Sequence, residues 1–352
     1  MKLLIINIGG SSTKLAVYEN ENELTLETIR HSSQELNAFD SIWAQYEFRK
    51  KVVEDFLKKH NYKIEDFSAI VSRGAVVKPL QSGTYLIDKA LLADAQSGKY
   101  GAHPSGLGCE IAYALADNKI PCLTVDPPCV DEMIDIARIT GWPDIKRVSF
   151  FQVLNHKAKG RELAEQLGTV YEKLNLVIAH LGSGISVASH KQGQVIDVTN
   201  GLEGDSPMGL DRVGTLAAGD WMRYCLSGKK SKEELSAIIN GGGGIKAHLG
   251  TNSALEVEEM IDNGNSYANQ IYEAMAFQVA KGIGAASAAL GTCPDGIIVT
   301  GGLANSTRFM SWLRARISWI APLYVMPDDN EILSLAKGAL RALHDSSLLK
   351  NY

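Results

Sequence analysis

Short glycine- and serine-rich turns between apolar stretches are the features of this sequence best suited to chemistry. The first turn lies between the apolar residues 3–6 and 15–18, and a second has the same setting between 176–179 and 185–188. Backbone N–H groups that converge in a tight turn form an anion-binding concavity, and glycine lets a ligand approach them closely. The residues expected to bind phosphate are Asn7, Gly10, Ser11, Ser12, Thr13 and Lys14 in the first turn, and His180, Gly182, Ser183 and Gly184 in the second.

A third glycine-rich segment leads from the apolar stretch 297–300 into a helical pattern. Such a junction can hold a nucleotide at the helix N-terminus, which makes Gly301, Gly302 and Asn305 candidate nucleotide-binding residues. The P-loop spacing and the dinucleotide fingerprint are both absent from the sequence, and residues 204–208 lack the closing glycine of a nucleophile elbow. These absences disfavour a P-loop enzyme, a nicotinamide dehydrogenase and an α/β-hydrolase.

The elements around these turns alternate between strand and helix patterns. Residues 107–118 and 332–343 have helical periodicity, and a longer helix is expected at about 267–290. Residues 120–125 and 296–300 have the apolar pattern of buried strands. This alternation predicts an α/β fold with ligand-binding groups at the strand ends. The similarity of the two phosphate turns predicts two related domains that face each other across a cleft.

Composition limits the class of protein. The 352 residues are 45% apolar and 21% charged, which fits a globular chain of about two domains. A net charge of −5 supplies no basic field for nucleic acid. The apolar start, residues 3–6, is too short for a signal sequence or a membrane span, so a cytoplasmic location is expected. The five cysteines are scattered and predict neither disulfides nor a zinc site.

Many ordered stretches of the chain resemble the acetate and butyrate kinases, which belong to the superfamily of sugar kinases, Hsp70 and actin. The resemblance extends from end to end, and residues 211–216 and 241–252 look closer to butyrate kinases. It implies duplicated ribonuclease-H-like domains, an N-terminal one at 1–148 plus 333–352 and a nucleotide-binding one at 149–332. The matching stretches are 7–14, 71–74, 101–105, 125–128, 154–157, 180–186, 211–215, 241–252, 297–306 and 327–331.

The resemblance also implies a reaction, the transfer of a phosphoryl group from ATP to a short-chain carboxylate. Such a transfer brings two anions together, and the planar fork of arginine can pair with a carboxylate or a phosphate. No general base is required, because the carboxylate is already ionised at neutral pH. By resemblance, the catalytic residues are Arg73, His103, Asp126, Gln152, His156 and Arg212.

Magnesium, a homodimer and a final helix that packs on the first domain are further implications of the resemblance. Magnesium binds a few oxygen ligands and keeps several waters, so one or two carboxylates suffice. The expected ligands are Asn7, Asp126 and Glu331. Glu331 also opens a predicted helix, where a carboxylate would suit the positive helix end.

Two positions depart from the family pattern. Acetate kinases have histidine where this chain has Gln152, whereas His156 replaces the glutamine usual in butyrate kinases. One hypothesis is that the cation has moved by one helical turn, so that His156 serves the phosphoryl oxygens. The alternative is that Gln152 acts as a neutral donor and His156 only packs. Ser183 stands where acetate kinases have asparagine and butyrate kinases usually have glycine.

The function predicted is therefore reversible phosphorylation of butyrate or a branched short-chain acid, by direct in-line attack on the γ-phosphorus. Acetate or propionate is the rival acceptor. An Hsp70-like or actin-like nucleotide switch, which would use the same turns without a small-molecule acceptor, is the alternative from another class.

Overall fold

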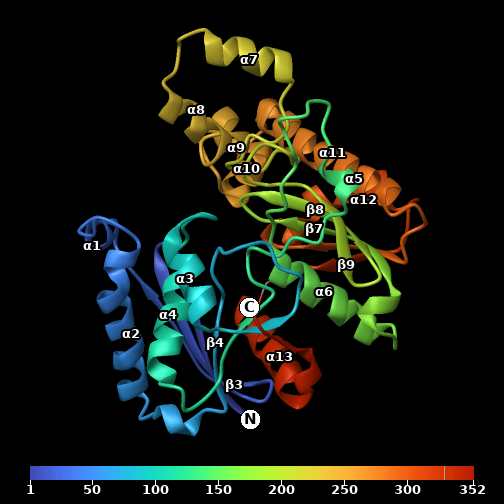
Figure 1. Ribbon diagram of the computed structural model, residues 1–352. Helices are drawn as coiled ribbons and strands as arrows, with labels where there is room; N and C mark the ends of the chain where they lie inside the picture. The colour runs from blue at the N-terminus through green and yellow to red at the C-terminus, as the bar shows by residue number, and fades with distance from the viewer. Residues whose placement is uncertain (329) are drawn as a thin grey trace. The chain divides into compact units, whose positions relative to one another are not determined.

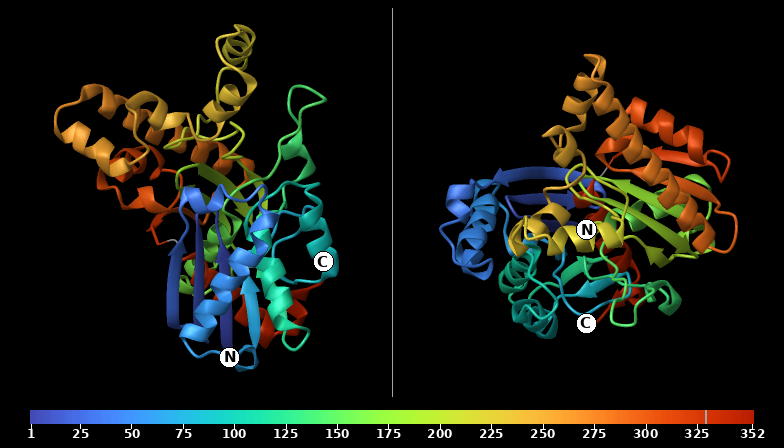
Figure 2. Two further views of the ribbon diagram at one scale, coloured as in Figure 1. Left: turned by 90° about the vertical axis from the view of Figure 1, so that its left-hand side faces the viewer. Right: turned by 90° about the horizontal axis from the view of Figure 1, so that it is seen from above.

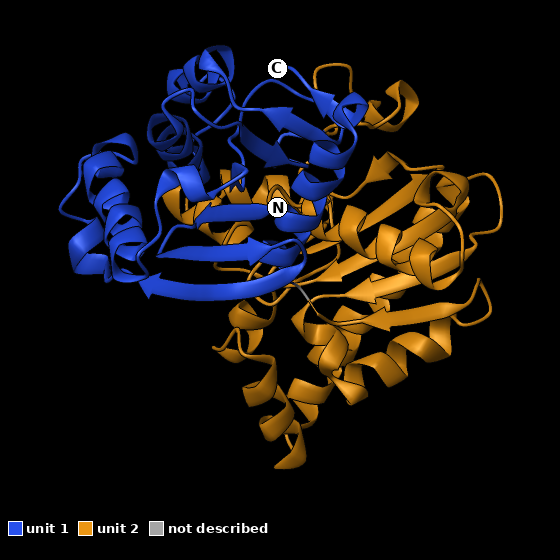
Figure 3. Ribbon diagram, turned by 90° about the horizontal axis from the view of Figure 1, so that it is seen from below, with its two compact units in different colours: residues 1–130, 330–352 blue, residues 131–329 orange. Residues whose placement is uncertain are grey.

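The computed structural model describes residues 1–328 and 330–352, which divide into two compact units. Unit 1 comprises residues 1–130 and 330–352, and unit 2 comprises residues 131–329 (Figure 3). The predicted domains have other boundaries, because they place 131–148 in the N-terminal domain and 330–332 in the nucleotide-binding one. In the structure, 131–148 groups with unit 2 and 330–332 with unit 1. Hydrogen bonds explain the first difference. The N–H of Ile134 donates to the Ile196 carbonyl, and Arg147 pairs with Asp197 at 2.6 Å and with Asp205 at 2.8 Å.

Unit 1 is built on a seven-stranded sheet of order β12-β5-β6-β4-β1-β2-β3. Strand β1 pairs antiparallel with β2 and parallel with β4, which in turn pairs parallel with β6. The strands are β1 (Lys2–Ile8), β2 (Ser12–Glu19), β3 (Asn22–Arg30), β4 (Ala69–Ser72), β5 (Thr84–Leu86), β6 (Cys122–Val125) and β12 (Leu349–Lys350). The α-helices are α1 (Ser33–Leu36), α2 (Tyr46–Lys59), α3 (Lys89–Ser97), α4 (Ser105–Ala116) and α13 (Glu331–His344).

Helices α4 and α13 cover opposite faces of the unit 1 sheet. Ser72 and Thr124 are register partners on β4 and β6, and the next residue, Val125, points to the other face. A Cβ built on Gly108 of α4 would lie 2.7 Å from Ser72 Oγ, whereas one on Gly338 of α13 would lie 2.2 Å from Val125 Cγ1. Figures 1 and 2 show α2 and α4 on one side of this sheet and α13 on the other. The final helix therefore packs on the first unit, as expected.

Unit 2 is built on a five-stranded sheet of order β11-β10-β7-β8-β9. Its strands are β7 (Asn175–Leu181), β8 (Ile185–Lys191), β9 (Gln194–Val198), β10 (Gly296–Thr300) and β11 (Leu323–Met326). Its helices are α5 (Asp135–Arg138), α6 (Val153–Gln166), α7 (Ala218–Leu226), α8 (Lys232–Ile239), α9 (Gly244–Leu249), α10 (Ala254–Asp262), α11 (Ser266–Ala289), α12 (Thr307–Ile317) and a 3₁₀ turn, η4 (Gly302–Asn305). Helices α11 and α6 cover opposite faces, since Val187 lies beside Gly282 of α11 and the adjacent Ser186 lies beside His156 of α6.

The two sheets repeat one arrangement, which confirms the predicted α/β duplication. The order β6-β4-β1-β2-β3 corresponds strand for strand to β11-β10-β7-β8-β9, with the same parallel and antiparallel pairings. The register also shifts between β2 and β3 in unit 1 and between the corresponding β8 and β9 in unit 2. The predicted helices at 107–118, 267–290 and 332–343 correspond to α4, α11 and α13 within two residues. None of the helices among the described residues is long and apolar enough to cross a membrane.

Candidate active site

Three predicted residues lie at one edge of the unit 1 sheet. Asn7 is near the end of β1, Arg73 directly follows β4, and Asp126 directly follows β6. These strands are neighbours and run parallel, so their carboxyl ends meet at the same edge, where α/β proteins bind ligands. All three residues are buried. The register therefore brings them together although they are far apart in the sequence.

Glu331 joins this group from the start of α13. The Asn7 amide donates to Glu331 Oε2 at 3.0 Å, and Arg73 Nε lies 3.6 Å from Glu331 Oε1. Asn330 caps the helix by accepting the N–H of Leu333, so Glu331 is not needed as a cap. Arg73 Nη1 is buried and has no hydrogen-bond partner among the described residues. The arrangement leaves a buried cationic donor available to an anion.

His103 is held in one tautomer close to this group. Its Nδ1 accepts the backbone N–H of Ser105 at 3.2 Å and lies 2.8 Å from Ser105 Oγ. The pKa of His103 is lowered, first by the protein atoms that desolvate its ring and then by the charge of Arg73, while Glu331 opposes the shift. Neutral His103 therefore carries its proton on Nε2 and can donate it in a hydrogen bond.

Asp126 and Arg73 are fixed by close packing of the loops that follow their strands. The Asp126 backbone is left-handed, with φ of 41°, and its carboxylate accepts the N–H of Gly83 at 2.7 Å. Gly74 has φ of 98°, and a Cβ there would lie 2.7 Å from Pro127 Cβ. Only glycine fits at position 74, because both its backbone angle and its surroundings exclude a side chain.

The turn after β1 presents two free backbone donors. Gly9 N–H donates to the Ser12 carbonyl at 2.9 Å, while the N–H groups of the exposed residues Gly10 and Ser11 meet no acceptor within the described chain. A Cβ on Gly10 would have no neighbour within 4 Å, so the space in front of it is open. Lys14 is exposed and pairs in register with Asn7. The Thr13 hydroxyl is buried, 3.0 Å from His31 Nε2, and faces away from this space.

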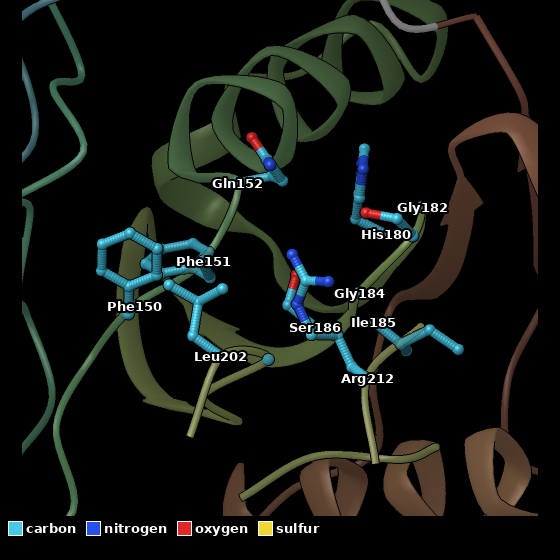
Figure 4. A pocket seen from close by; sticks show the side chains of 12 residues that line it. Phe150, Phe151, Gln152, His180, Gly182, Gly184, Ile185, Ser186, Leu202 and Arg212 are labelled. Atoms are coloured by element: carbon cyan, nitrogen blue, oxygen red, sulfur yellow. The ribbon is translucent and has the colours of Figure 1, made fainter. Parts of the chain in front are cut away.

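A pocket of about 110 Å³ in unit 2 collects most of the residues predicted there (Figure 4). It combines aromatic and aliphatic walls with a small number of polar groups, as ligand pockets do. Figure 4 shows the Arg212 guanidinium reaching into the space beside Phe151, Gln152 and His180. The pocket is lined by Phe150, Phe151, Gln152, His180, Gly182, Ser183, Gly184, Ile185, Ser186, Gly201, Leu202 and Arg212.

Arg212 resembles Arg73 of unit 1, because each arginine combines an ion pair with a buried donor that has no partner among the described residues. Arg212 Nη1 forms an ion pair with Asp211, while its buried Nε has no partner among the described residues. A Cβ on Gly184 would lie 3.3 Å from Arg212 Cγ and from the Gly201 carbonyl, so glycine at 184 makes room for the arginine. His180 is oriented by Asn155, whose Oδ1 lies 3.1 Å from His180 Nδ1.

Gln152 and His156 occupy different environments. Gln152 precedes the first turn of α6 and lines the pocket, whereas the side chain of His156 is fully buried behind it. His156 Nε2 lies 3.0 Å from Ser186 Oγ, and its Nδ1 lies 3.3 Å from His190 Nε2. Burial and the neighbouring His190 and His180 hold the pKa of His156 well below its usual range. A neutral, enclosed His156 presents no positive charge to the pocket, which favours the alternative that Gln152 is the donor and His156 packs.

The third glycine-rich segment lies beside a second hollow of unit 2. Gly301 has φ of 88°, and a Cβ there would lie 2.7 Å from the Leu181 carbonyl, so this turn packs directly on the end of β7. Gly302 and Asn305 line a hollow of about 920 Å³. The remaining residues of this hollow come from η4, α10, α12 and the residues that flank them, and include Glu258, Asp262, Arg308 and Trp312.

Comparison with known proteins identifies the family. The model of the Acetokinase family matches residues 145–332. A probable butyrate kinase of Listeria monocytogenes serotype 4a (strain HCC23) is 45% identical over 351 residues, which is 99% of each chain. The chain belongs to the acetokinase family. As a member it is a carboxylate kinase, a phosphotransferase that takes its phosphoryl group from ATP.

Solved structures of an acetate kinase and a propionate kinase share the fold described above. Acetate kinase from Porphyromonas gingivalis superposes with a TM-score of 0.80 at 19% identity, over 97% of this chain and 99% of that one. A propionate kinase from Francisella tularensis subsp. tularensis SCHU S4 has a TM-score of 0.76 at 18% identity, over 96% of this chain and 98% of that one. At this level of identity the comparison confirms the architecture.

Several residues that line the two hollows of unit 2 were not anticipated. Phe150 and Leu202 line the pocket around Arg212, and Glu258 and Trp312 line the hollow beside Gly302. Their sequence signal is no different from that of ordinary core or surface positions. Only the adjacency of Phe150 to Phe151 and Gln152 could have indicated one of them.

Proposed function

We propose that this protein is a magnesium-dependent kinase of butyrate or a branched short-chain acid, which forms the acyl phosphate and ADP reversibly. The observation that carries the proposal is the pocket in which Arg212, with a free Nε donor, stands beside Phe150, Phe151 and Leu202. An arginine can pair with a carboxylate, and apolar walls can cover a short alkyl chain. Curated relatives over the whole chain are probable butyrate kinases, which favours this acceptor over acetate.

The proposed chemistry is direct in-line attack of the carboxylate oxygen on the γ-phosphorus. Because the acceptor is already ionised, the residues need only position the reactants and stabilise charge on the transferred group. In unit 1, the free Nη1 of Arg73 and the Nε2–H of His103 would donate to phosphoryl or carboxylate oxygens. In unit 2, Arg212 and the neutral amide of Gln152 would do the same, and Gly182, Ser183 and Gly184 would bind nucleotide phosphate. Gly301, Gly302 and Asn305 would hold the adenosine.

The same edge of unit 1 suits magnesium. Asn7, Asp126 and Glu331 offer an amide and two carboxylates, which is the oxygen donor set that Mg²⁺ prefers, and the Asn7–Glu331 hydrogen bond keeps two of them adjacent. We propose these three residues as those that hold the ion, directly or through water. When bound, magnesium would neutralise charge on the nucleotide phosphates. The described residues contain no group of three or more His, Cys, Asp or Glu side chains that could chelate a metal alone.

The test is formation of acyl phosphate, trapped as the hydroxamate, with ATP and magnesium across unbranched and branched acids from two to six carbons. We expect the highest kcat/KM with butyrate or a branched acid of similar length. A maximum at acetate or propionate would assign the enzyme to the rival acceptor. No product with any acid would overturn the proposed function.

We further propose a cytoplasmic homodimer, in which exposed apolar residues of unit 2 meet a second copy of the chain. Leu226 of α7 is 79% exposed, and Ile136, Ile139 and Trp142 are at least 61% exposed. Figure 1 shows α7 and the loop that follows α5 projecting from the remainder of unit 2. Large apolar side chains that stay exposed on such segments can form an association surface with a second copy.

A further inference from the structure

Arg49 has an environment that its sequence does not suggest. It lies in the charged run 49–51 of α2, whose residue types alone favour contact with solvent. Its side chain is nevertheless fully buried, whereas that of Lys51 is 71% exposed. Arg49 is among the largest completely buried side chains of the protein. An arginine in this position must have its donors satisfied within the fold.

All hydrogen-bond partners of Arg49 are neutral. Nε donates to Gln45 Oε1 at 3.2 Å, and Nη1 donates to Thr13 Oγ1 at 3.0 Å. Nη2 donates to the carbonyls of Gly10 at 2.9 Å and Gly9 at 3.3 Å. No carboxylate among the described residues pairs with it. Burial lowers the pKa of Arg49, yet a guanidinium stays protonated at neutral pH. An unpaired positive charge is therefore enclosed behind the turn after β1.

These contacts determine which backbone groups the turn presents. Arg49 binds the Gly9 and Gly10 carbonyls, and the N–H of His31 binds the Ser11 carbonyl at 2.9 Å. The Thr13 hydroxyl accepts from Arg49, so it can donate to His31 Nε2. With the carbonyls held toward the core, the N–H groups of the exposed residues Gly10 and Ser11 remain as donors. Free backbone N–H groups in a tight turn can bind an anion.

We infer that Arg49 is a positioning residue for the nucleotide phosphates: it fixes the Gly9–Gly10 carbonyls so that the Gly10 and Ser11 N–H groups face the ligand, and its charge attracts that anion through the turn. A buried unpaired charge costs free energy, and an anion bound on the other side of the turn reduces this cost. Arg49 does not touch the substrate in this scheme. The inference rests on the proposed function, since it assigns a phosphate group of ATP to the turn of unit 1.

The experiment compares Arg49→Met, Arg49→Lys and the control Lys51→Met, which removes the same charge from an exposed position of the same helix. For each variant we would measure the unfolding temperature, kcat, KM for ATP and for the carboxylate, and the affinities for ATP and adenosine by calorimetry. We expect Arg49→Met to lower kcat/KM for ATP at least tenfold and to weaken ATP binding, with adenosine binding and the carboxylate KM within twofold of wild type. Arg49→Lys should have an intermediate loss, because it keeps the charge and loses the fork. Lys51→Met should resemble wild type.

A folded Arg49→Met enzyme with kcat/KM for ATP within twofold of wild type would overturn the inference. So would equal weakening of ATP and adenosine binding, which indicates a general structural role. If Arg49→Met does not fold, Arg49→Lys decides, since unaltered use of ATP contradicts the requirement for the fork. Failure of wild type to phosphorylate any acid would instead contradict the proposed function, and the ATP-to-adenosine comparison would still test Arg49.

Discussion

At the residue scale, the site depends on donors that the folded chain leaves unused. Arg73 Nη1 and Arg212 Nε are both buried and have no partner among the described residues. Unsatisfied buried donors are uncommon, and the cost of leaving one unpaired is about 1–3 kcal/mol. A ligand oxygen that accepts from such a group recovers that cost on binding. Each arginine therefore retains one donor for an anionic ligand in addition to its ion pair with Glu331 or Asp211.

We expect Arg73→Ala and Arg212→Ala each to lower kcat while the fold is retained. Loss of a charge-assisted contact made in the transition state costs about 2–4 kcal/mol, which corresponds to about 30-fold to 1,000-fold in rate. Steady-state kinetics of the two variants and circular dichroism would check this. Arg314→Ala, at an exposed position of α12, is the control. Near-normal turnover of either arginine variant would remove that residue from the proposed site.

Gln152→Ala and His156→Ala should have opposite profiles. Gln152 lines the pocket, so its loss should lower kcat and leave the unfolding temperature nearly unchanged. His156→Ala leaves Ser186 and His190 without their buried partner, which should destabilise unit 2 by about 1–3 kcal/mol. Thermal unfolding and kinetics of both variants would separate the two roles. A crippled kcat in a fully stable His156→Ala enzyme would revive the relocated cation.

At the scale of elements, the position of α13 depends on a close contact at Gly338, where there is no room for a side chain. The Gly338 carbonyl accepts a hydrogen bond from the Thr84 hydroxyl at 3.1 Å, and the Cα of Gly338 lies against Val125 of β6. Since Glu331 opens the same helix, the fit of Gly338 helps to set the position of Glu331 beside Asn7 and Arg73.

Gly338→Ala and Gly284→Ala form a matched pair of helix substitutions with opposite expected signs. Gly338→Ala would place its methyl group 2.2 Å from Val125 Cγ1 and should destabilise the protein by about 1–3 kcal/mol through overpacking. A Cβ on Gly284 of α11 meets nothing within 4 Å, so Gly284→Ala should stabilise by about 0.5–1 kcal/mol through helix propensity. Denaturant unfolding of both variants checks the signs. Equal effects would contradict the tight packing of α13.

At the scale of the whole molecule, one strand arrangement occurs twice, and the residues at the strand ends differ between the two copies. Asn7 and His180 occupy corresponding positions, opposite Lys14 and Ser186. The copy in unit 1 carries Arg73, Asp126 and Glu331 at its edge, whereas the copy in unit 2 carries the pocket of Gln152 and Arg212. Duplication thus supplies two anion-binding edges, which suits a reaction between two anionic substrates.

The proposed dimer has a direct test. Leu226→Asp combined with Ile139→Asp places charges on two highly exposed apolar positions and should shift the protein from dimer to monomer. The reason is that an interface must remove these side chains from water, which a carboxylate resists. Light scattering coupled to size-exclusion chromatography would report the mass. Trp319→Asp, at a position that is 81% exposed in the same unit, is the control. A wild-type monomer would contradict the dimer outright.

The sequence by itself determined the local features and their order. Apolar runs and glycine turns predicted β1, β2, β7 and β8, because strands and tight turns depend on residues close in the chain. Helical periodicity likewise placed α4, α11 and α13. The ordered motifs indicated the family, and with it the residues that the structure gathers at Asn7, Arg73, Asp126 and Glu331.

Only the tertiary structure decided which side chains of those elements face the ligand. Arg49 and Lys51 share a charged run, yet the former is enclosed and the latter is solvated. Gln152 and His156 are one helical turn apart, yet only Gln152 lines the pocket. Burial and pKa depend on what packs against a side chain from distant parts of the chain. Such neighbours are Thr13 and Gly10 for Arg49, and Ser186 and His190 for His156. The local sequence does not specify them.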